Sequence, residues 1–409
     1  MRKWIGLLCL VSLVSCNEPL LDSLPRFMRE QDRFARQARQ SGQQKDTLDP
    51  EKPPEPDIPE YVPSVYATAL HFRDSVNWRL DSLGAAEVLF FKDGALVRRQ
   101  QVSSPPDPER HRIWNGQLWT DYTDGRETVL LCDGLERFRY QGEELLRGFL
   151  IVDGDVHTLG QRPGNGGFCY RINGEPIFSQ DKGSVLGSPS GPAWKGGALN
   201  LDGGEVYYSY KTDHIYYVMK GGMTFRVVPG KTFDALYDLK VHGGHLWSIQ
   251  KKANKLSLVC DDEARPLDVT ASDAYSCRLV PTGDQVQVLG CSRLGGGWYS
   301  FWLAPFDTGT PLSKGTGRSL KSELCYRDPD TLLADVNDDG ILLKLQFDSV
   351  DLGIPSKVYT GPSARNLFLT QSHFAAGLSH SGAGPHLLLY DTKEYSLSFN
   401  GYFTSVLIE

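Results

Sequence analysis

Three oxygen-bearing side chains alternate along one short acidic segment of this 409-residue chain. Asp335, Asn337 and Asp339 precede a glycine in the order Asp-x-Asn-x-Asp-Gly. Calcium takes six to eight hard oxygen ligands, and alternate carboxylate and amide groups around a glycine turn can supply the first of them. However, Leu343 and Gln346 occupy the ninth and twelfth positions, where further acidic ligands would be needed. We therefore prefer an acidic hairpin turn, keep calcium as the weaker interpretation, and expect no other cofactor.

Aromatic residues in glycine-rich segments are the candidates for ligand binding. Exposed Trp or Tyr beside a basic residue suits sugar rings or a protein contact, and binding residues concentrate in loops on rigid scaffolds. Packing inside the core is the alternative interpretation for each of these residues. The candidates are Trp194 and Lys195 in residues 180–197, Trp298 and Tyr299 in residues 293–302, and Trp114 before another turn.

Signatures of catalysis are weak. No Cys-x-x-Cys or Gly-x-Ser-x-Gly motif occurs, and the nine histidines are scattered. His242 and His245 flank one turn and could bind a metal, but solvated turn histidines are more common. Residues 349–353 resemble the Asp-box of sialidase propellers, with Ser356 at its aromatic position. A glycosidase also needs two paired carboxyl groups, which nothing in the sequence marks.

The N-terminal residues form a secretory leader. Arg2 and Lys3 precede an apolar stretch, 4–14, that is too short to span a bilayer. The stretch ends in Leu-Val-Ser before Cys16, which resembles the lipobox of bacterial lipoproteins. The resemblance implies cleavage after residue 15, acylation of Cys16 and a membrane anchor formed by its acyl chains. Asn17 is not the Asp that retains such proteins in the inner membrane, so we expect an outer-membrane address, with the leaflet open.

Composition divides the chain into a leader, 1–15, a tether, 16–62, and a body, 63–409. Residues 20–34 place apolar side chains on one helical face, surrounded by arginines. This pattern fits either a membrane or partner contact or a partly helical tether. Residues 49–59 are dense in Pro and charge, which favours an extended stalk.

The body is a series of β-hairpins with a repeat. Short β-rich runs flank dipeptides such as Asp-Gly and Asn-Gly, which supply the positive φ that tight hairpin turns require. Spacings between the turns average about 43 residues, the size of one four-stranded propeller blade. We therefore predict an all-β fold, a β-propeller with seven blades favoured and six to eight possible. A pair of β-sandwiches is the main alternative. The seven anchor residues of the repeat are Asn115, Asp153, Gly203, Gly243, Gly283, Asp330 and Ser372.

One blade carries a further resemblance. Residues 152–160 and 170–174 are similar to a blade repeat of secreted Bacteroidetes proteins, with His157 in place of its Tyr. We also predict that the last strand of the chain completes the blade formed near residues 66–110. The six cysteines of the body mostly lie in apolar runs, so buried thiols are preferred over disulfides.

Charge narrows the choice of partners. The formal net charge of −7 argues against nucleic acid, because phosphate binding needs a basic surface. The sequence thus predicts an envelope lipoprotein whose propeller binds a glycan or an envelope protein. We favour a non-catalytic protein, and a carbohydrate-active hydrolase or lyase is the alternative.

Overall fold

The computed structural model describes most of the body of the chain, and every structural statement below concerns those residues. The described ranges are 63–72, 86–103, 106, 110–124, 127–141, 144–186, 198–270, 274–282, 285–296, 298–318, 323–326, 331–336, 341–344, 349–351, 359–360, 367–369, 373–380, 385–391 and 393–409. Cys16 and the tether therefore lie outside them. Over these ranges, no helix combines the length and apolar character needed to cross a bilayer.

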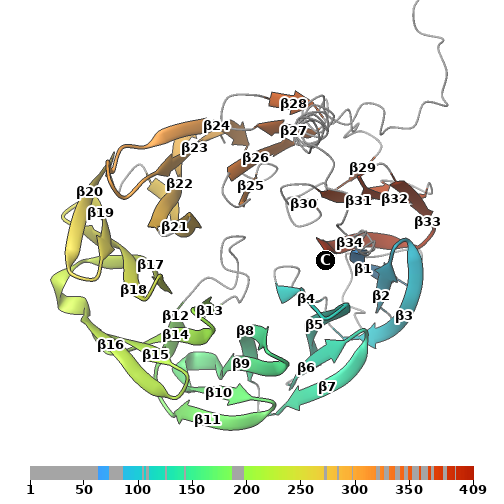
Figure 1. Cartoon of the computed structure of the whole chain (residues 1–409), viewed down its shortest axis with the longest axis horizontal. Coiled ribbons are helices and arrows are strands. Elements are labelled where there is room, and N and C mark those ends of the chain that lie inside the picture. Colours follow the sequence, from blue (N-terminus) through green and yellow to red (C-terminus); the bar gives the residue numbers. More distant parts are fainter. Residues whose placement is uncertain are drawn as a thin grey trace, which may run out of the picture.

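Eight antiparallel sheets stand around a common axis as the blades of a β-propeller (Figure 1). We number the blades along the chain and give the strands of each from the axis outward. Blade 1 contains β34 (Gly401–Ile408), β1 (Val65–Phe72), β2 (Ala86–Lys92) and β3 (Ala95–Val102). Blade 2 contains β4 (Arg112–Trp114), β5 (Gln117–Asp124), β6 (Glu127–Cys132) and β7 (Leu135–Tyr140). Blade 3 contains β8 (Leu145–Val152), β9 (Asp155–Gln161), β10 (Phe168–Ile172) and β11 (Glu175–Gln180).

The next three blades follow the same plan. Blade 4 contains β12 (Ser184–Leu186) and β13 (Leu199–Asp202) on the inside, then β14 (Glu205–Thr212), β15 (Ile215–Lys220) and β16 (Met223–Pro229). Blade 5 contains β17 (Ala235–His242), β18 (His245–Lys252), β19 (Lys255–Cys260) and β20 (Glu263–Thr270). Blade 6 contains β21 (Ala274–Thr282), β22 (Gln285–Gly295), β23 (Trp298–Ala304) and β24 (Leu312–Arg318).

Two blades complete the ring. Blade 7 contains β25 (Glu323–Tyr326), β26 (Thr331–Val336), β27 (Ile341–Lys344) and β28 (Ser349–Asp351). Blade 8 contains β29 (Tyr359–Thr360) and β30 (Leu367–Leu369), then β31 (Phe374–His380), β32 (His386–Tyr390) and β33 (Lys393–Leu397). Two short 3-10 helices, Pro163–Asn165 and Gly230–Thr232, lie in loops.

The two ends of the body close the ring within blade 1. Strand β34 pairs antiparallel with β1, and Ser64 and Glu409 exchange backbone hydrogen bonds of 2.7 and 3.0 Å. The predicted sharing of a blade between the C-terminal strand and residues near 66–110 is confirmed. The pairing of β34 with β1 closes the ring, and each blade keeps only one short outer edge strand on the rim.

The described residues form eight sheets, one more than the favoured seven blades and within the predicted range of six to eight. The seven sequence anchors coincide with the connections between first and second strands in blades 2 to 8. In blade 1 that connection is interrupted, because its first strand is the end of the chain and its second strand begins the body. The turn at Asp93 and Gly94 joins the second and third strands of this blade, so blade 1 has no anchor at the position that the repeat marks in the other blades.

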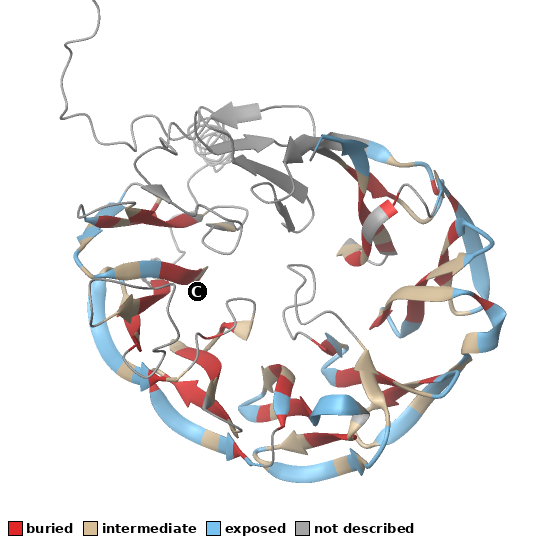
Figure 2. Ribbon diagram, turned by 180° about the vertical axis from the view of Figure 1, so that it is seen from behind, coloured by how far each residue is buried: buried red, intermediate tan, exposed pale blue. Residues whose placement is uncertain are grey.

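The core lies between neighbouring blades. One cluster joins Val88 and Phe90 of blade 1 to Leu118 and Val129 of blade 2, all buried. Figure 2 shows buried residues on the inner strands and exposed residues around the outer rim. Among the described residues, such clusters join blade 8 to blade 1 and each successive pair from blade 1 to blade 6. Losing a Leu side chain from such a site costs about 2–5 kcal/mol.

Outer strands also pack on the turns of the following blade. Gly94 has φ +76°, and a Cβ there would lie 2.1 Å from the ring of Tyr395 in β33. Gly174 has φ +84°, and a Cβ there would lie 3.0 Å from Phe138 in β7. These two turns need glycine both for the backbone angle and for the close approach of an aromatic ring.

Candidate functional site

The innermost strand of blade 4 is interrupted. Strands β12 and β13 both pair with β14, with Leu186 opposite Ser209 and Leu199 opposite Tyr208. Because Ser209 and Tyr208 are adjacent, the chain leaves β12 and returns to β13 at nearly the same point. The intervening residues 187–197 are therefore attached to the edge of the sheet that faces the axis (Figure 1).

These intervening residues include two of the predicted binding residues. Trp194 and Lys195 themselves lie outside the described residues. What the structure places is their two points of attachment, Leu186 and Leu199, on the axis-facing edge. The predicted role of both side chains stays a prediction.

Blade 8 has the same interruption. Strands β29 and β30 both pair with β31, with Thr360 opposite Ser379 and Leu367 opposite Ala376. Blades 4 and 8 are four blades apart in either direction around the ring of eight, so they lie opposite each other (Figure 1).

Polar side chains join the inner strands near blade 4 to one another. Buried Asn200 in β13 accepts a 2.8 Å hydrogen bond from the Val241 N–H and donates a 2.9 Å bond to its carbonyl oxygen. Asp238 in β17 accepts a 3.0 Å bond from Leu279 N–H in β21. Each bond spans 41 residues, one repeat of the chain. Strand β13, which follows the interruption, is thereby tied to the inner strands of blades 5 and 6.

Lys240 is a charged residue that the sequence analysis did not single out. It lies in β17, is buried, and burial lowers the pKa of its ammonium group, while Asp238 opposes that shift. Its position between Leu239 and Val241 in an apolar inner strand hides it from a sequence search for exposed basic residues.

The remaining predicted site residues do not form one site. Trp114 ends β4, is half-buried in the cluster with Trp119 and Phe149, and a Cβ on Gly154 would lie 3.4 Å from its ring. This position favours the packing interpretation for Trp114. Trp298 and Tyr299 begin β23 in blade 6.

The predicted calcium segment connects two strands of blade 7. Asp335 lies in β26, where its backbone pairs with Leu342 of β27. Asn337 and Asp339 lie outside the described residues, so the calcium interpretation is untested. Asp335 therefore lies on the sheet of blade 7, whereas Trp298 and Tyr299 lie on the separate sheet of blade 6.

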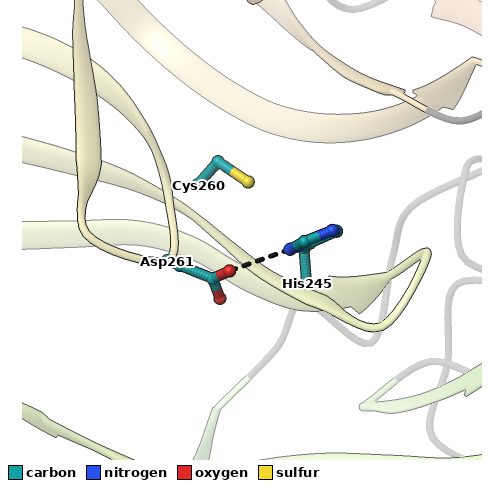
Figure 3. A group of neighbouring side chains, drawn as sticks. All are labelled: His245, Cys260 and Asp261. Atoms are coloured by element: carbon teal, nitrogen blue, oxygen red, sulfur yellow. Dashed lines mark hydrogen bonds and ion pairs between the residues drawn. The ribbon is translucent and has the colours of Figure 1, made fainter.

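One cluster of metal-ligating side chains does come together, where the two middle strands of blade 5 begin and end (Figure 3). His245 begins β18, Cys260 ends β19, and Asp261 starts the turn to β20. One ligand atom from each of the three lies within 4.8 Å of the others. His245 Nδ1 donates a 2.8 Å hydrogen bond to Asp261 Oδ2.

The backbone fixes Asp261 in this cluster. Its Oδ1 accepts a 3.0 Å bond from Leu246 N–H, and its own N–H donates a 2.7 Å bond to the Leu246 carbonyl. Arg226 of blade 4 approaches the same Oδ1 at 3.3 Å. Bonds from His245 and Leu246 lower the pKa of the Asp261 carboxyl against the opposing effect of burial. Burial raises the pKa of the Cys260 thiol.

His242, which the sequence pairs with His245, belongs elsewhere. The two histidines are opposite each other across the turn, but His242 Nδ1 lies 3.9 Å from Asp202 of blade 4. Each histidine thus faces a different carboxylate, and the pair does not form a joint site.

Strands β6 and β19 each end at a cysteine that an aspartate follows, and nothing in the sequence alone connects either pair to a histidine. Aligning blades 2 and 5 by their turns would have placed His245 opposite Gln117, and Cys260 opposite Cys132. No disulfide joins any of the five cysteines whose thiols are described, Cys132 and Cys260 among them, in line with the preferred interpretation.

Comparisons with known proteins identify no family and no function. No family model matches the sequence, and no curated protein sequence matches it significantly. The chain is similar in structure to BamB from Moraxella catarrhalis (TM-score 0.45, 12% identity, 75% of this chain and 89% of that one). It is similar to the dihydro-heme d1 dehydrogenase NirN in complex with DHE (TM-score 0.49, 11% identity, 83% and 74%). It is also similar to the WD40 propeller domain of Doa1 (TM-score 0.36, 12% identity, 65% and 85%).

These likenesses carry no argument about binding or catalysis, because each TM-score is below 0.5. The assignment as a β-propeller rests on the eight sheets of the chain itself and on their closure through β34.

Proposed function

We propose that this protein is a cell-envelope lipoprotein whose propeller binds a glycan or an envelope protein without catalysis. The observation that carries the proposal is the interrupted inner strand of blade 4. It attaches the Gly- and Pro-rich segment with Trp194 and Lys195 to the axis-facing edge of a rigid sheet. Ligand-binding residues concentrate on loops that a rigid scaffold positions, and an aromatic ring beside an ammonium group suits a sugar face.

The inner strands support this proposal by their rigidity. The hydrogen bonds of Asn200 and Asp238 to neighbouring inner strands hold the scaffold around the attachment points. A fixed scaffold lowers the ordering cost of binding, because the strands that carry the segment are already held in place. Side-chain contacts of the segment with its ligand then decide specificity.

The anchor is the second part of the proposal. Acylation of Cys16 would attach the protein to the outer membrane, and the Pro-rich stalk would hold the propeller away from the bilayer. Radiolabelled fatty acid should enter the wild-type protein, and the Cys16→Ser variant should remain unlabelled in the soluble fraction. Equal labelling of both proteins would contradict the anchor.

Ligand binding is tested by screening the full-length protein on a glycan array and by cross-linking it in envelope preparations. The Trp194→Ala variant should lose binding by at least about tenfold, since removing an aromatic anchor costs about 2 kcal/mol or more. The matched control is Met223→Ala, because Met223 is 72% exposed on the outer strand β16, away from the axis. Wild-type affinity in Trp194→Ala would refute the assigned segment, and turnover of a bound glycan would favour the carbohydrate-active alternative.

A further inference from the structure

We propose that His245, Cys260 and Asp261 bind one zinc ion at the edge of blade 5. A thiolate, an imidazole and a carboxylate are the protein ligands that zinc takes. This set differs from the oxygen-only set of the calcium segment in blade 7 and involves none of its residues. Three protein ligands with a fourth position for water is a recognised zinc arrangement.

The three ligands are already close to a coordination geometry. Their ligand atoms lie within 4.8 Å of one another. In a tetrahedral zinc site these separations are about 3.3–3.7 Å, given zinc–ligand bonds of about 2.0–2.3 Å. His245 Nδ1 and Asp261 Oδ2, now 2.8 Å apart, would open slightly, and the Cys260 side chain would turn inward. Side-chain rotations accomplish both changes without a shift of the strands.

The elements that hold the ligands are fixed by the blade. The backbone of Asp261 is hydrogen-bonded to Leu246 in both directions, which ties the turn after β19 to the start of β18. Only His245 has a freely accessible side chain, with 56% of its surface exposed, and Asp261 is 27% exposed. An ion can therefore enter from solvent at His245 and meet ligands that are already positioned.

Other blades use the same three positions for structure alone. In blade 2 the positions hold Gln117, Cys132 and Asp133, and Asp133 accepts a 2.8 Å bond from Leu118 N–H. In blade 8, His373 Nδ1 donates a 2.7 Å bond to Asp391, but Tyr390 occupies the cysteine position. Blades 2 and 5 thus share the carboxylate–backbone bond of this turn. Among these three described turns, blade 5 alone combines histidine, cysteine and aspartate.

Arg226 is the opposing charge at this site. Its guanidinium lies 3.3 Å from Asp261 Oδ1, and both side chains are partly exposed, at 43% and 27%. A zinc ion would compete with this contact for the carboxylate. Removing the arginine charge in Arg226→Gln should therefore tighten zinc binding several-fold, whereas an unrelated adventitious site would not respond.

The test titrates the full-length, reduced protein with Zn²⁺ by calorimetry and with Co²⁺ by absorption spectroscopy. We expect one ion per chain and a thiolate-to-cobalt charge-transfer band. His245→Gln and Cys260→Ser should each weaken Zn²⁺ binding by at least about tenfold, as expected for a lost ligand. Glutamine is a fold-compatible replacement because blade 2 carries Gln117 at the equivalent position.

The matched control is His373→Gln in blade 8, which removes an equivalent histidine–aspartate bond from a turn without cysteine. This variant should bind zinc as the wild type does. Two results would overturn the proposal: cobalt binding without a thiolate band, or unchanged zinc affinity in His245→Gln and Cys260→Ser. Thermal unfolding of each variant without metal verifies that it is folded.

Discussion

Glu409 Oε2 accepts a 2.7 Å hydrogen bond from the backbone N–H of Gly116, although the two residues are 293 positions apart. Glu409 also exchanges backbone bonds with Ser64. The last residue of the chain therefore connects the closing blade to the first turn of blade 2. An equivalent contact joins blades 4 and 5, where Asp202 accepts 2.8 Å bonds from the N–H groups of Gly243 and Gly244.

Removing the Glu409 side chain should weaken ring closure. In Glu409→Ala the N–H of Gly116 loses its acceptor, and we expect the free energy of unfolding to fall by about 1–2 kcal/mol. Urea unfolding measures the change. Glu394→Ala is the control, because Glu394 is exposed on β33 and should change stability by less than about 0.5 kcal/mol. Equal effects of the two variants would show that the side chain of Glu409 does not stabilise the closure.

Two glycines with similar backbone angles should differ in their tolerance of alanine. Gly94 has φ +76° and its missing Cβ would overlap Tyr395, whereas Gly244 has φ +74° with no atom within 4 Å of that position. Both substitutions carry the cost of a positive φ, about 1 kcal/mol. Gly94→Ala should cost a further 1–3 kcal/mol, approximately, from overpacking. Thermal unfolding of the two variants gives the difference, and equal losses would refute the packing of Tyr395 on this turn.

Two arginines whose carboxylate partners differ in burial should also behave differently. Arg171 Nη2 donates a 2.8 Å bond to Glu144, whose side chain is 5% exposed, and Arg171 lies 5.0 Å from the centre of the Tyr140 ring. Arg171→Ala leaves the Glu144 carboxylate buried without this partner, and we expect a loss of about 3–5 kcal/mol.

The comparison for Arg171 is Arg139. Arg139 pairs with Glu127 and Glu136 on the outer rim, with 31% of its own side chain exposed. Arg139→Ala should cost no more than about 1 kcal/mol, as solvent screens such pairs. Chemical denaturation measures both losses. A loss for Arg171→Ala as small as that for Arg139→Ala would contradict the buried pair.

His386 should make stability depend on pH. Its Nδ1 accepts a 2.9 Å bond from His380 N–H and its Nε2 donates a 2.8 Å bond to the Phe399 carbonyl, so the folded protein needs the neutral ring. Burial lowers the pKa of His386, with His380 acting in the same direction and the bond to Phe399 opposing it. The unfolded chain, with a histidine pKa near about 6.5, then takes up the proton first.

Because the unfolded chain is protonated at a higher pH than the folded protein, acid lowers the free energy of unfolding. Stability from the neutral ring is present above about pH 6.5 and is lost as pH falls toward the lower folded-state pKa. Urea midpoints between about pH 7.5 and 5 should therefore decline more in the wild type than in His386→Gln. His157, whose pKa is also lowered by burial, remains in both proteins and cancels in the comparison. Parallel pH profiles would remove His386 as a contributor.

Much of the fold could be predicted because hairpin turns have local sequence requirements. Asn115 and Asp153 do stand in turns between first and second strands, with φ of +48° and +51°. The first and second strands of blade 1 come from opposite ends of the body and share no turn, so a count of turns at that position misses this blade. The ends of the interruption in blade 4 likewise became visible only when Leu186 and Leu199 were found opposite adjacent residues of β14.

The sequence by itself determined the all-β class and the repeat of hairpins, because both depend on residues a few positions apart. It also predicted the shared blade that closes the ring, because the number of repeats can be compared with the length of the body. The tertiary structure alone decided which distant side chains meet. Gly116 and Glu409 form one hydrogen bond, and Arg226 of blade 4 reaches the turn of Asp261 in blade 5. Such contacts depend on the angle and spacing between blades, which packing across their faces sets and no local pattern encodes.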